Sequence, residues 1–584
     1  MVRNTNPSAA ALQARRALAS LPAGEAGGRA RASLGLALRA LGDEAEAARE
    51  LEAAALVVGG DLRRALLGEA GSGRAGLVPA PPPASAAVDP VAAAEPLVAA
   101  ARHREALAAL AAADAAALPP LRRARAGALR ALALLGLGQR PDAAAEARKV
   151  LAIRSDAGTR DAAELVLARV AARDGRHAEA IAHYRRIAAR RGPVPGLAEQ
   201  AQRDLRDDAS FLAAWLPYDA GRFAEASRSL TAWLGAHPGS RRADDARWFA
   251  AWSYVRMGNR DKAREALGRL TSGTHAPAAL YWQARLVDGP AAQGRLLRRA
   301  RAAGGPESWY GQLAASRLAA LGLPVEPWRV APGNPPGDGP GPGAAGARLG
   351  RAAALLGAGL DVAGRAALAE AARSPGGSAA RVAQLAEALG NAELAARMAR
   401  DHLAVTRRSL AWGHPRAFGE PLQLVAAAAG VDPFLLLAVA RRESGFRAEV
   451  RSAAGAEGPF QLLPATEERL AALAGLARPG HLSEPSRAVA SAGLYLGLLT
   501  DRFAHPAAAV AAYNAGPAAA ATWGRGLAGL PLDEWVEDLP FRETRRYVKA
   551  VLADAGVYRW LYEGGDLRID GLVLVPAPGA GAAF

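Results

Sequence analysis

Small apolar residues, above all alanine, are spread along most of the chain, and runs of β-branched residues typical of strands are scarce. Alanine has the highest helix propensity of the common residues, so this pattern predicts a mainly all-α protein. Within it, a turn made of glycine and polar residues recurs before a helix start rich in small residues. Four copies, GQRPDAAAEA, GRHAEAIAHY, GRFAEASRSL and GNRDKAREAL, begin at Gly138, Gly175, Gly221 and Gly258, and GDEAEAAREL at Gly42 looks like an isolated earlier copy.

The four copies are separated by 37, 46 and 37 residues. Each fits a helix–turn–helix unit in which small alanines let the helices pack closely. The period is near that of tetratricopeptide repeats but irregular, so we predict a tetratricopeptide-like helical superhelix. Stacked helix pairs of this kind form an extended concave surface that suits binding.

Three stretches rich in proline and glycine interrupt the helical pattern, at residues 70–95, at residues 325–347 and in the tail from Gly564. Proline lacks a backbone donor and glycine adds conformational entropy, so neither continues a helix well. The chain, with 584 residues, is also too long for one hydrophobic core. We therefore expect an N-terminal helical segment (1–69), a Pro/Ala-rich linker (70–99), an α-superhelical repeat domain (100–324), a Pro/Gly-rich linker (325–347), linker helices (348–415), a C-terminal domain (416–565) and a tail (566–584).

A different pattern opens the C-terminal domain, where residues 434–440 are apolar on every side of a predicted helix. Asp432 can cap this helix and Pro433 suits its first turn. A helix that is apolar all round is buried. Glu443 lies one turn beyond the end of this apolar run, at the end of the helix. Its carboxyl group should be partly desolvated, which raises its pKa towards the range of a general acid.

The helix alone leaves a second interpretation of Glu443 open. The carboxylate could instead pair in solvent with Arg441, Arg442 or Arg447, which are close in sequence.

Three later stretches supply polar side chains at ends of helices and in turns. They are RSAAGAEGPFQLLPAT (451–466), AAYNAGP (511–517) and LPFRETRRYVKAVL (539–552). Glycines in the first stretch let the backbone approach a ligand closely, and serine and glutamine supply hydrogen bonds.

Taken in order, ESGF, a serine nine residues after the glutamate, G-x-x-Q-x-x-P, AYNAG and PFxETRxYV resemble the soluble lytic transglycosylases of bacterial cell-wall metabolism. ALYWQARL (279–286) and WYGQLAASRLA (309–319) look like the end of that family's helical superhelix. The resemblance covers most of residues 130–565 and is most specific over 432–552.

The resemblance implies that residues 416–565 form a lysozyme-like catalytic domain. The implied reaction cleaves the β-1,4 bond between N-acetylmuramic acid and N-acetylglucosamine in peptidoglycan. The muramyl 6-hydroxyl, not water, attacks C1 and leaves a 1,6-anhydro end. Most glycosidases need two carboxylates, but only one strong candidate is present, and one suffices if the substrate's 2-acetamido group stabilises the reacting centre. We expect no cofactor and no metal.

The same resemblance assigns roles. Glu443 would be the general acid and then the base, and the substrate-binding residues would be Ser452, Phe460, Gln461, Tyr513, Asn514 and Glu543. The serine would orient the acetamido group, the glutamine would bind sugar, and the tyrosine would hydrogen-bond near the reacting sugar while the asparagine fixes its loop. Glu543 would be a second carboxylate in the cleft that contacts peptide stems or supports the structure.

For Glu543, an ion pair with Arg545 or Arg546 is the alternative.

The chain departs from the family pattern in three places. Pro459 and Phe460 replace a Leu-Met pair, Val489 replaces an asparagine, and Glu457 adds a charge. Phe460 still offers an apolar wall for a sugar face, although a stiffer one than methionine. These changes affect subsite fit and substrate range more than reaction type.

Charge and composition add few constraints. The formal net charge of +16 favours an acidic partner such as nucleic acid, anionic lipid or the anionic cell wall, although an arginine-rich genome would give the same excess. No basic stripe with interleaved aromatics supports nucleic-acid binding, and the nine histidines have no metal-ligand spacing. We see no secretory signal and no transmembrane stretch, so a periplasmic or envelope location is inferred from the substrate alone.

Two other functions remain open. A muramidase on the same fold would use water and a second carboxylate, for which Glu457 and Asp501 are loose candidates. A non-catalytic scaffold would work through its repeats and bind the wall. In either case the glycan strands of peptidoglycan are the expected partner, and cell-wall synthesis or division proteins could bind the repeats.

Overall fold

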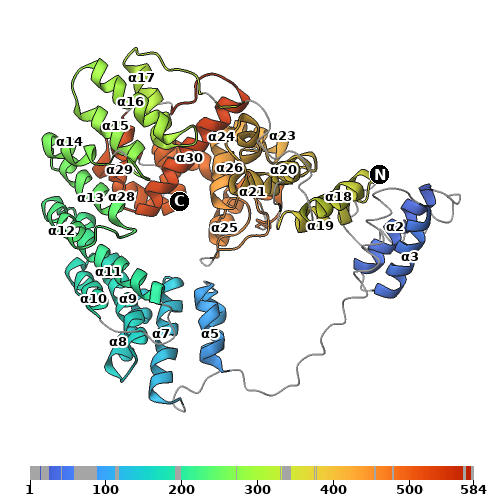
Figure 1. Ribbon diagram of the computed structural model, residues 1–584, viewed down its shortest axis with the longest axis horizontal. Coiled ribbons are helices and arrows are strands. Elements are labelled where there is room, and N and C mark those ends of the chain that lie inside the picture. The colour runs from blue at the N-terminus through green and yellow to red at the C-terminus, as the bar shows by residue number, and fades with distance from the viewer. Residues whose placement is uncertain are drawn as a thin grey trace. The chain divides into compact units, whose positions relative to one another are not determined.

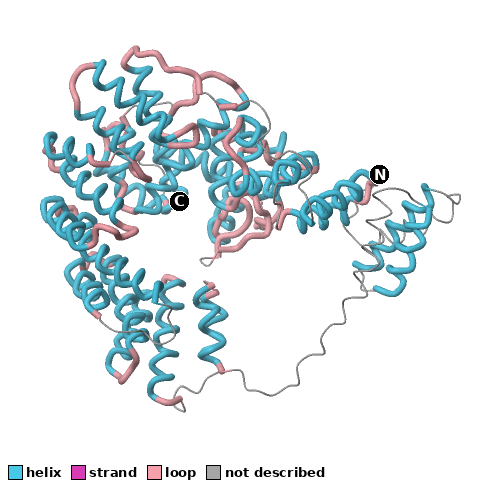
Figure 2. The backbone as a smooth tube through the Cα atoms, in the orientation of Figure 1, coloured by secondary structure: helices cyan, strands magenta, loops and turns pink. Residues whose placement is uncertain are grey.

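The structure, a computed structural model, describes residues 14, 25–40, 43–57, 89–100, 102–111, 118–190, 199–270, 272–328, 330–331, 344–373, 375, 378–452, 455–476, 479–569 and 574–579. Among these residues there is no β-strand, and the β pairing consists of three isolated bridges. Figure 2 shows the described backbone as helices joined by loops. The prediction of a mainly all-α chain is confirmed. Most of the linkers expected at 70–95 and 325–347, and the repeat glycine Gly42, lie outside the described residues.

The chain divides into two compact units. One contains described residues of 1–85, 329–419 and 445–447, and the other contains those of 86–328, 420–444 and 448–584. Each unit contains segments that are distant in sequence, whereas the seven segments predicted from the sequence follow one another along the chain. The division into seven segments remains a proposal.

The first unit packs its N-terminal helices with helices from the middle of the chain. Leu51, Leu349, Met398 and Trp412 lie in its shared core, each at most 3% exposed. Its helices are α2 (Glu25–Ala40), α3 (Glu44–Val57), α18 (Ala344–Gly357), α19 (Asp361–Ala371), α20 (Ala379–Ala388), α21 (Ala392–His402) and α22 (Arg407–Gly413).

The second unit begins with the helical repeats, in which each helix packs against the next (Figure 1). These helices are α5 (Pro90–Ala99), α6 (His103–Ala111), α7 (Pro120–Gly136), α8 (Arg140–Ala152), α9 (Ala157–Arg173), α10 (His177–Ala189), α11 (Glu199–Asp219), α12 (Phe223–Ala236), α13 (Ala243–Arg256), α14 (Arg260–Gly268), α15 (Ala276–Leu286), α16 (Pro290–Gly304) and α17 (Trp309–Ala320).

The four glycines of the repeated turn have the same conformation. Gly138, Gly175, Gly221 and Gly258 have φ values of 78°, 74°, 71° and 68°, in the left-handed region that glycine adopts most easily. In every copy the next N–H donates to a carbonyl five residues earlier, at 2.8–3.0 Å. This is the Schellman motif that closes a helix before the next one starts. The predicted helix–turn–helix unit is therefore present at all four positions.

The C-terminal part of the second unit contains α23 (Gly419–Ala428), α24 (Pro433–Glu443), α25 (Pro464–Leu473), α26 (Pro485–Phe503), α27 (Pro506–Ala515), α28 (Pro517–Leu527), α29 (Leu532–Asp538) and α30 (Arg542–Tyr562). Helix α24 starts as predicted, because the Asp432 side chain accepts a hydrogen bond from the Phe434 N–H and proline follows the cap. All seven residues of 434–440 are buried. Helix α24 packs against α30, so the end of α24 is held inside the unit.

The last repeat helices pack directly on this C-terminal part. The Tyr281 hydroxyl of α15 donates to Asp533 of α29 at 2.5 Å, and Arg317 of α17 donates to the same carboxylate at 2.8 Å. The Gln312 amide of α17 donates to the Ala553 carbonyl of α30 at 2.8 Å. Helices α15 and α17 thus hold α29 and α30 in place.

Within the described residues no single helix has the length and hydropathy of a membrane span. Helices α23 and α24 meet that test only as a pair, by length and composition, and are bent by 118° between them.

Candidate active site

The end of helix α24 places Glu443 at the border between the core and solvent. The helix stops there because Ser444 caps it, with its N–H bonded to the carbonyls of the preceding turn. The Ser444 hydroxyl also donates to the Pro459 carbonyl at 2.7 Å. This bond fixes the glycine-rich loop, residues 451–463, beside this end of the helix. Glu443 itself is only partly exposed.

Burial is the main influence on the Glu443 carboxyl and raises its pKa to about 7. Contact with the Tyr547 hydroxyl acts in the opposite direction, and the negative charge of Glu543 raises the pKa further. A carboxyl with a pKa near 7 can give and take a proton at neutral pH.

The two arginines before Glu443 face another partner. The Arg441 guanidinium donates to Asp554 of α30 at 2.8 Å, and Arg442 donates to both oxygens of Asp554 at 2.6 and 2.7 Å. These contacts weigh against a surface ion pair of Glu443 with Arg441 or Arg442 and leave burial as the main influence on Glu443.

Two tyrosines from different helices adjoin Glu443. Tyr513 of α27 donates its hydroxyl hydrogen bond to the Phe460 carbonyl at 2.8 Å, and its ring lies 5.2 Å from the Tyr495 ring. Burial is the main cause that raises the pKa of Tyr513, and the negative charge of Glu443 raises it further. Tyr547 of α30 touches Glu443 directly, yet its buried hydroxyl makes no well-formed hydrogen bond to any described residue. That hydroxyl therefore lies beside the Glu443 carboxyl.

The glycine-rich loop uses its polar side chains to hold its own shape. The Gln461 amide donates to the carbonyls of Val450 at 3.1 Å and Gly458 at 2.9 Å, and the Ser452 hydroxyl accepts from the Ala456 N–H at 3.0 Å. Gln461 has φ 48°, unusual for a residue other than glycine. Its amide oxygen and the Ser452 hydroxyl proton keep hydrogen-bonding capacity for a ligand.

Phe460 does not lie where a sugar could reach its ring. Its side chain is 1% exposed, so the ring fills the core under the loop. The expectation of an apolar wall at this position therefore finds no support in the packing; the backbone carbonyl of Phe460 instead anchors Tyr513.

Asn514 and Glu543 lie where α27 and α30 come together. The Asn514 side chain accepts a hydrogen bond from the Thr544 hydroxyl at 2.7 Å, which ties the end of α27 to the start of α30. Glu543 is exposed and makes no ion pair with any described residue, while Arg545 donates to the Leu539 carbonyl at 2.6 Å. The ion pair considered for Glu543 is therefore not formed with Arg545.

Reasoning from the sequence missed two residues of this site. Tyr547 is four residues after Glu543, and that helical spacing in the PFxETRxYV stretch was the available signal. Asp554 had no comparable signal, because its partner Arg442 is 112 residues away in the sequence.

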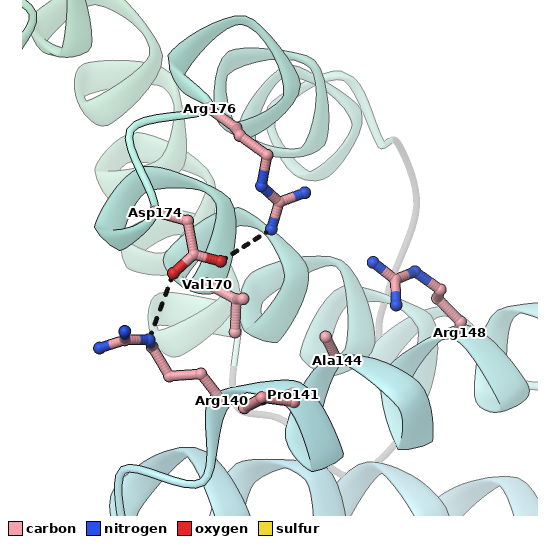
Figure 3. Close-up of a pocket in the computed structure, with 7 residues that line it drawn as sticks. All are labelled: Arg140, Pro141, Ala144, Arg148, Val170, Asp174 and Arg176. Carbon is pink, nitrogen blue, oxygen red and sulfur yellow. Dashed lines mark hydrogen bonds and ion pairs between the residues drawn. The ribbon is translucent and has the colours of Figure 1, made fainter.

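A separate pocket of about 290 Å³ lies in the repeats (Figure 3). Asp174 lies between Arg140 and Arg176 and pairs with them at 3.2 and 3.0 Å. The residues that line this pocket are Arg140, Pro141, Ala144, Arg148, Val170, Asp174 and Arg176, and none of them is a predicted site residue. Among the described residues, no group of three or more acidic or histidine side chains is placed to hold a metal ion.

Comparison with known proteins identifies a family domain that includes Glu443 and Tyr513. Residues 421–531 match the family model described as "Transglycosylase SLT domain", so the C-terminal part of the chain contains a domain of that family. The soluble lytic murein transglycosylase of Escherichia coli K12 is 31% identical over 159 residues, which are 26% of this chain and 25% of that protein. The protein of the same name from Salmonella typhimurium is 32% identical over 158 residues, 25% of this chain and 24% of that one. The chain thus matches about a quarter of the length of these curated relatives.

Solved structures extend the likeness of the fold beyond this domain. An inactive mutant of the lytic transglycosylase Slt from Pseudomonas aeruginosa has a TM-score of 0.54 and 21% identity, over 94% of this chain and 84% of that one. The 70-kDa soluble lytic transglycosylase of Escherichia coli gives 0.48 and 21% identity, over 96% and 87%. The first of these shows a shared fold.

Proposed function

We propose that this chain is a lytic transglycosylase that cleaves the β-1,4 bond between N-acetylmuramic acid and N-acetylglucosamine in peptidoglycan and leaves 1,6-anhydro ends. The observation that carries the proposal is Glu443: one partly buried carboxyl with a pKa of about 7, beside two tyrosines, in a transglycosylase SLT domain. The curated relatives are named soluble lytic murein transglycosylases, which supports the proposal.

A single glutamate can serve both steps of this reaction. Protonated Glu443 gives its proton to the glycosidic oxygen while the bond from that oxygen to C1 breaks. The resulting carboxylate then takes the proton of the muramyl 6-hydroxyl while its oxygen bonds to C1. Glu443 ends protonated and no water is consumed. A pKa of about 7 suits this exchange, because both forms are populated at neutral pH.

The other side chains support the same chemistry. The Tyr547 hydroxyl, which lacks a well-formed hydrogen bond among the described residues, can bond to Glu443 or to the reacting sugar. Ser452 and Gln461 retain capacity for the acetamido group and the sugar ring, whereas Asn514 fixes α27 against α30. The exposed Glu543 suits contact with the peptide stem.

Hydrolysis by a muramidase needs a second carboxylate that activates water. Of the two loose candidates, Glu457 pairs with Arg451 at 3.3 Å, and Asp501 is exposed in the last turn of α26. These contacts favour the transglycosylase. From the substrate we further propose a periplasmic or envelope-associated location, with cell-wall synthesis or division proteins as partners of the repeats.

Digestion of purified sacculi tests the proposal. Mass spectrometry of the released muropeptides should show 1,6-anhydro ends. Reducing muramic acid ends would indicate the muramidase instead. If neither product forms, while both the protein and its Glu443→Gln variant bind sacculi, the scaffold interpretation is correct.

A further inference from the structure

One face of helix α30 carries four groups that lie along helix α24. Glu543, Tyr547, Asp554 and Tyr558 follow one another at intervals of four, seven and four residues, which places them on one side of a helix. Along this face the two helices run in opposite directions: Tyr558 stacks on Phe434 with ring centroids 6.0 Å apart, and Tyr547 meets Glu443 at the other end.

Asp554 lies between these two contacts. Its carboxylate is fully buried and accepts three hydrogen bonds from the guanidinium groups of Arg441 and Arg442. Arg441 also reaches Glu307, before α17, at 3.5 Å. The two cations that precede Glu443 in the sequence are thus paired with two carboxylates, Asp554 and Glu307.

We infer that Asp554 is a positioning residue for the proposed reaction, which holds Arg441 and Arg442 away from Glu443 so that its carboxyl remains a proton donor. The inference rests on the proposed function. It concerns a residue outside the sequence motifs, and Asp554 acts on the substrate only through Glu443.

Two physical effects follow from this geometry. The three hydrogen bonds fix the last turn of α24 against α30, which sets where Glu443 points. They also determine how strongly the two positive charges influence the site. The charge of Arg442 already acts to lower the pKa of the Tyr547 hydroxyl. An unpaired cation this close would favour the ionised form of Glu443.

The groups that face Glu443 come from three helices. From other helices, Glu543 and Tyr547 of α30 and Tyr513 of α27 interact with Glu443. From its own helix α24, Arg441 and Arg442 directly precede it in the sequence. None of the three groups on the other helices is positively charged, so the two arginines are the nearby cations whose placement can be tested.

The first test is Asp554→Asn in the full-length chain. This change removes a negative charge and leaves two arginines with less compensation, so the Glu443 pKa should fall. Because the protonated form starts the reaction, the alkaline limb of the pH–rate profile on sacculi should move down by about one pH unit. Activity at pH 7 should fall about 5–10-fold.

A second variant should move the profile in the opposite direction. Arg442→Gln removes one cation and leaves the Arg441–Asp554 pair, and Arg442 is partly exposed, so the chain should tolerate the change. The alkaline limb should then move to higher pH. A purely structural role for Asp554 would lower the rate in either variant without moving the limb.

Asp533→Asn is the matched control. Asp533 is also fully buried and also pairs with two arginines, Arg285 and Arg317, but it belongs to α29. Its variant should lose stability and keep the wild-type limb. If the limbs of Asp554→Asn and Arg442→Gln coincide with that of the wild type, the inference is wrong.

Failure of the proposed function would look different. If the wild-type chain does not cleave sacculi, the Glu443 titration can be followed by infrared difference spectroscopy against Glu443→Gln. The carboxyl titration should still shift down in Asp554→Asn and up in Arg442→Gln. An unshifted titration would refute the inference independently of any activity.

Discussion

The exposed ion pairs of the repeats and the buried carboxylates around Glu443 have different roles. At the surface of the repeats, arginine and glutamate pair along one helix, as Arg176–Glu179 and Arg222–Glu225 do. Around α24, α29 and α30, fully buried carboxylates such as Asp533 and Asp554 join different helices. Exposed pairs contribute little to stability, whereas a buried carboxylate without its partners is costly. The difference shows that an exposed pair tolerates a change of charge better than a buried carboxylate does.

The largest expected effect is on catalysis. Glu443→Gln should lower the rate of muropeptide release about 10³-fold or more, because it removes the proton donor and acceptor. Glu179→Gln, the same change in the repeats, should leave the rate within about twofold. High-performance chromatography of digested sacculi measures both.

Equal losses of rate in Glu443→Gln and Glu179→Gln would mean that Glu443 is not the proton donor and acceptor of the reaction. Retained sacculus binding by Glu443→Gln, measured by co-sedimentation, excludes loss of folding as the cause.

The next largest effect is on the stability of the contact between the last repeat helices and the C-terminal part. Asp533→Asn should cost about 3–4 kcal/mol in the free energy of unfolding, because Arg317 loses its buried negative partner and an amide NH2 replaces one of the two acceptor oxygens. Urea denaturation followed by circular dichroism measures this loss. The same substitution at Asp261, which is exposed at the start of α14, should change stability by less than about 0.5 kcal/mol.

Two glycines with similar backbone angles should respond differently. Gly458 has φ 75°, and a Cβ there would lie 1.9 Å from the Leu482 carbonyl oxygen, whereas Gly221 has φ 71° and open space around it. Gly221→Ala should cost about 1 kcal/mol from the left-handed backbone alone. Gly458→Ala should cost about 2–3 kcal/mol, because the loop must also move. Similar losses in thermal denaturation would show that the loop yields easily.

Local features of both regions could be predicted from the sequence. The four repeat turns follow from glycine's access to positive φ, and the burial of α24 follows from an apolar run without a polar face. Both depend on neighbours in sequence. The positions of Glu443, Tyr513 and Glu543 near one another followed from the resemblance to known motifs.

Contacts between distant segments could not be predicted. The hydrogen bonds from Arg441 and Arg442 to Asp554 depend on how two antiparallel helices pack. The hydrogen bond from Tyr281 to Asp533 joins residues that are 252 positions apart in the sequence. The side-chain direction of Phe460 was also beyond the sequence, since an apolar residue in a loop can line a cleft or fill the core. Here it fills the core.

Stability should depend on pH through Glu443. Its pKa rises from 4.5 to about 7 on folding, so between these values the folded chain binds more protons than the unfolded chain. The free energy of unfolding therefore falls as pH rises through this window. Relative to Glu443→Gln, which does not titrate, the wild type should lose about 3 kcal/mol between pH 4.5 and pH 7.5. A constant difference across the window, in urea denaturation, would contradict the burial of Glu443.

The smallest expected effect concerns the surface pairs of the repeats. Arg222 and Glu225 approach to 3.3 Å, and each side chain is 47% exposed. A double-mutant cycle with alanine at both positions should give a coupling energy below about 0.5 kcal/mol, since water screens the two charges and ordering them costs side-chain entropy. Raising the salt concentration should weaken it further. A coupling above about 1 kcal/mol that persists in high salt would mean that this surface pair, like the buried carboxylates around Glu443, contributes to stability.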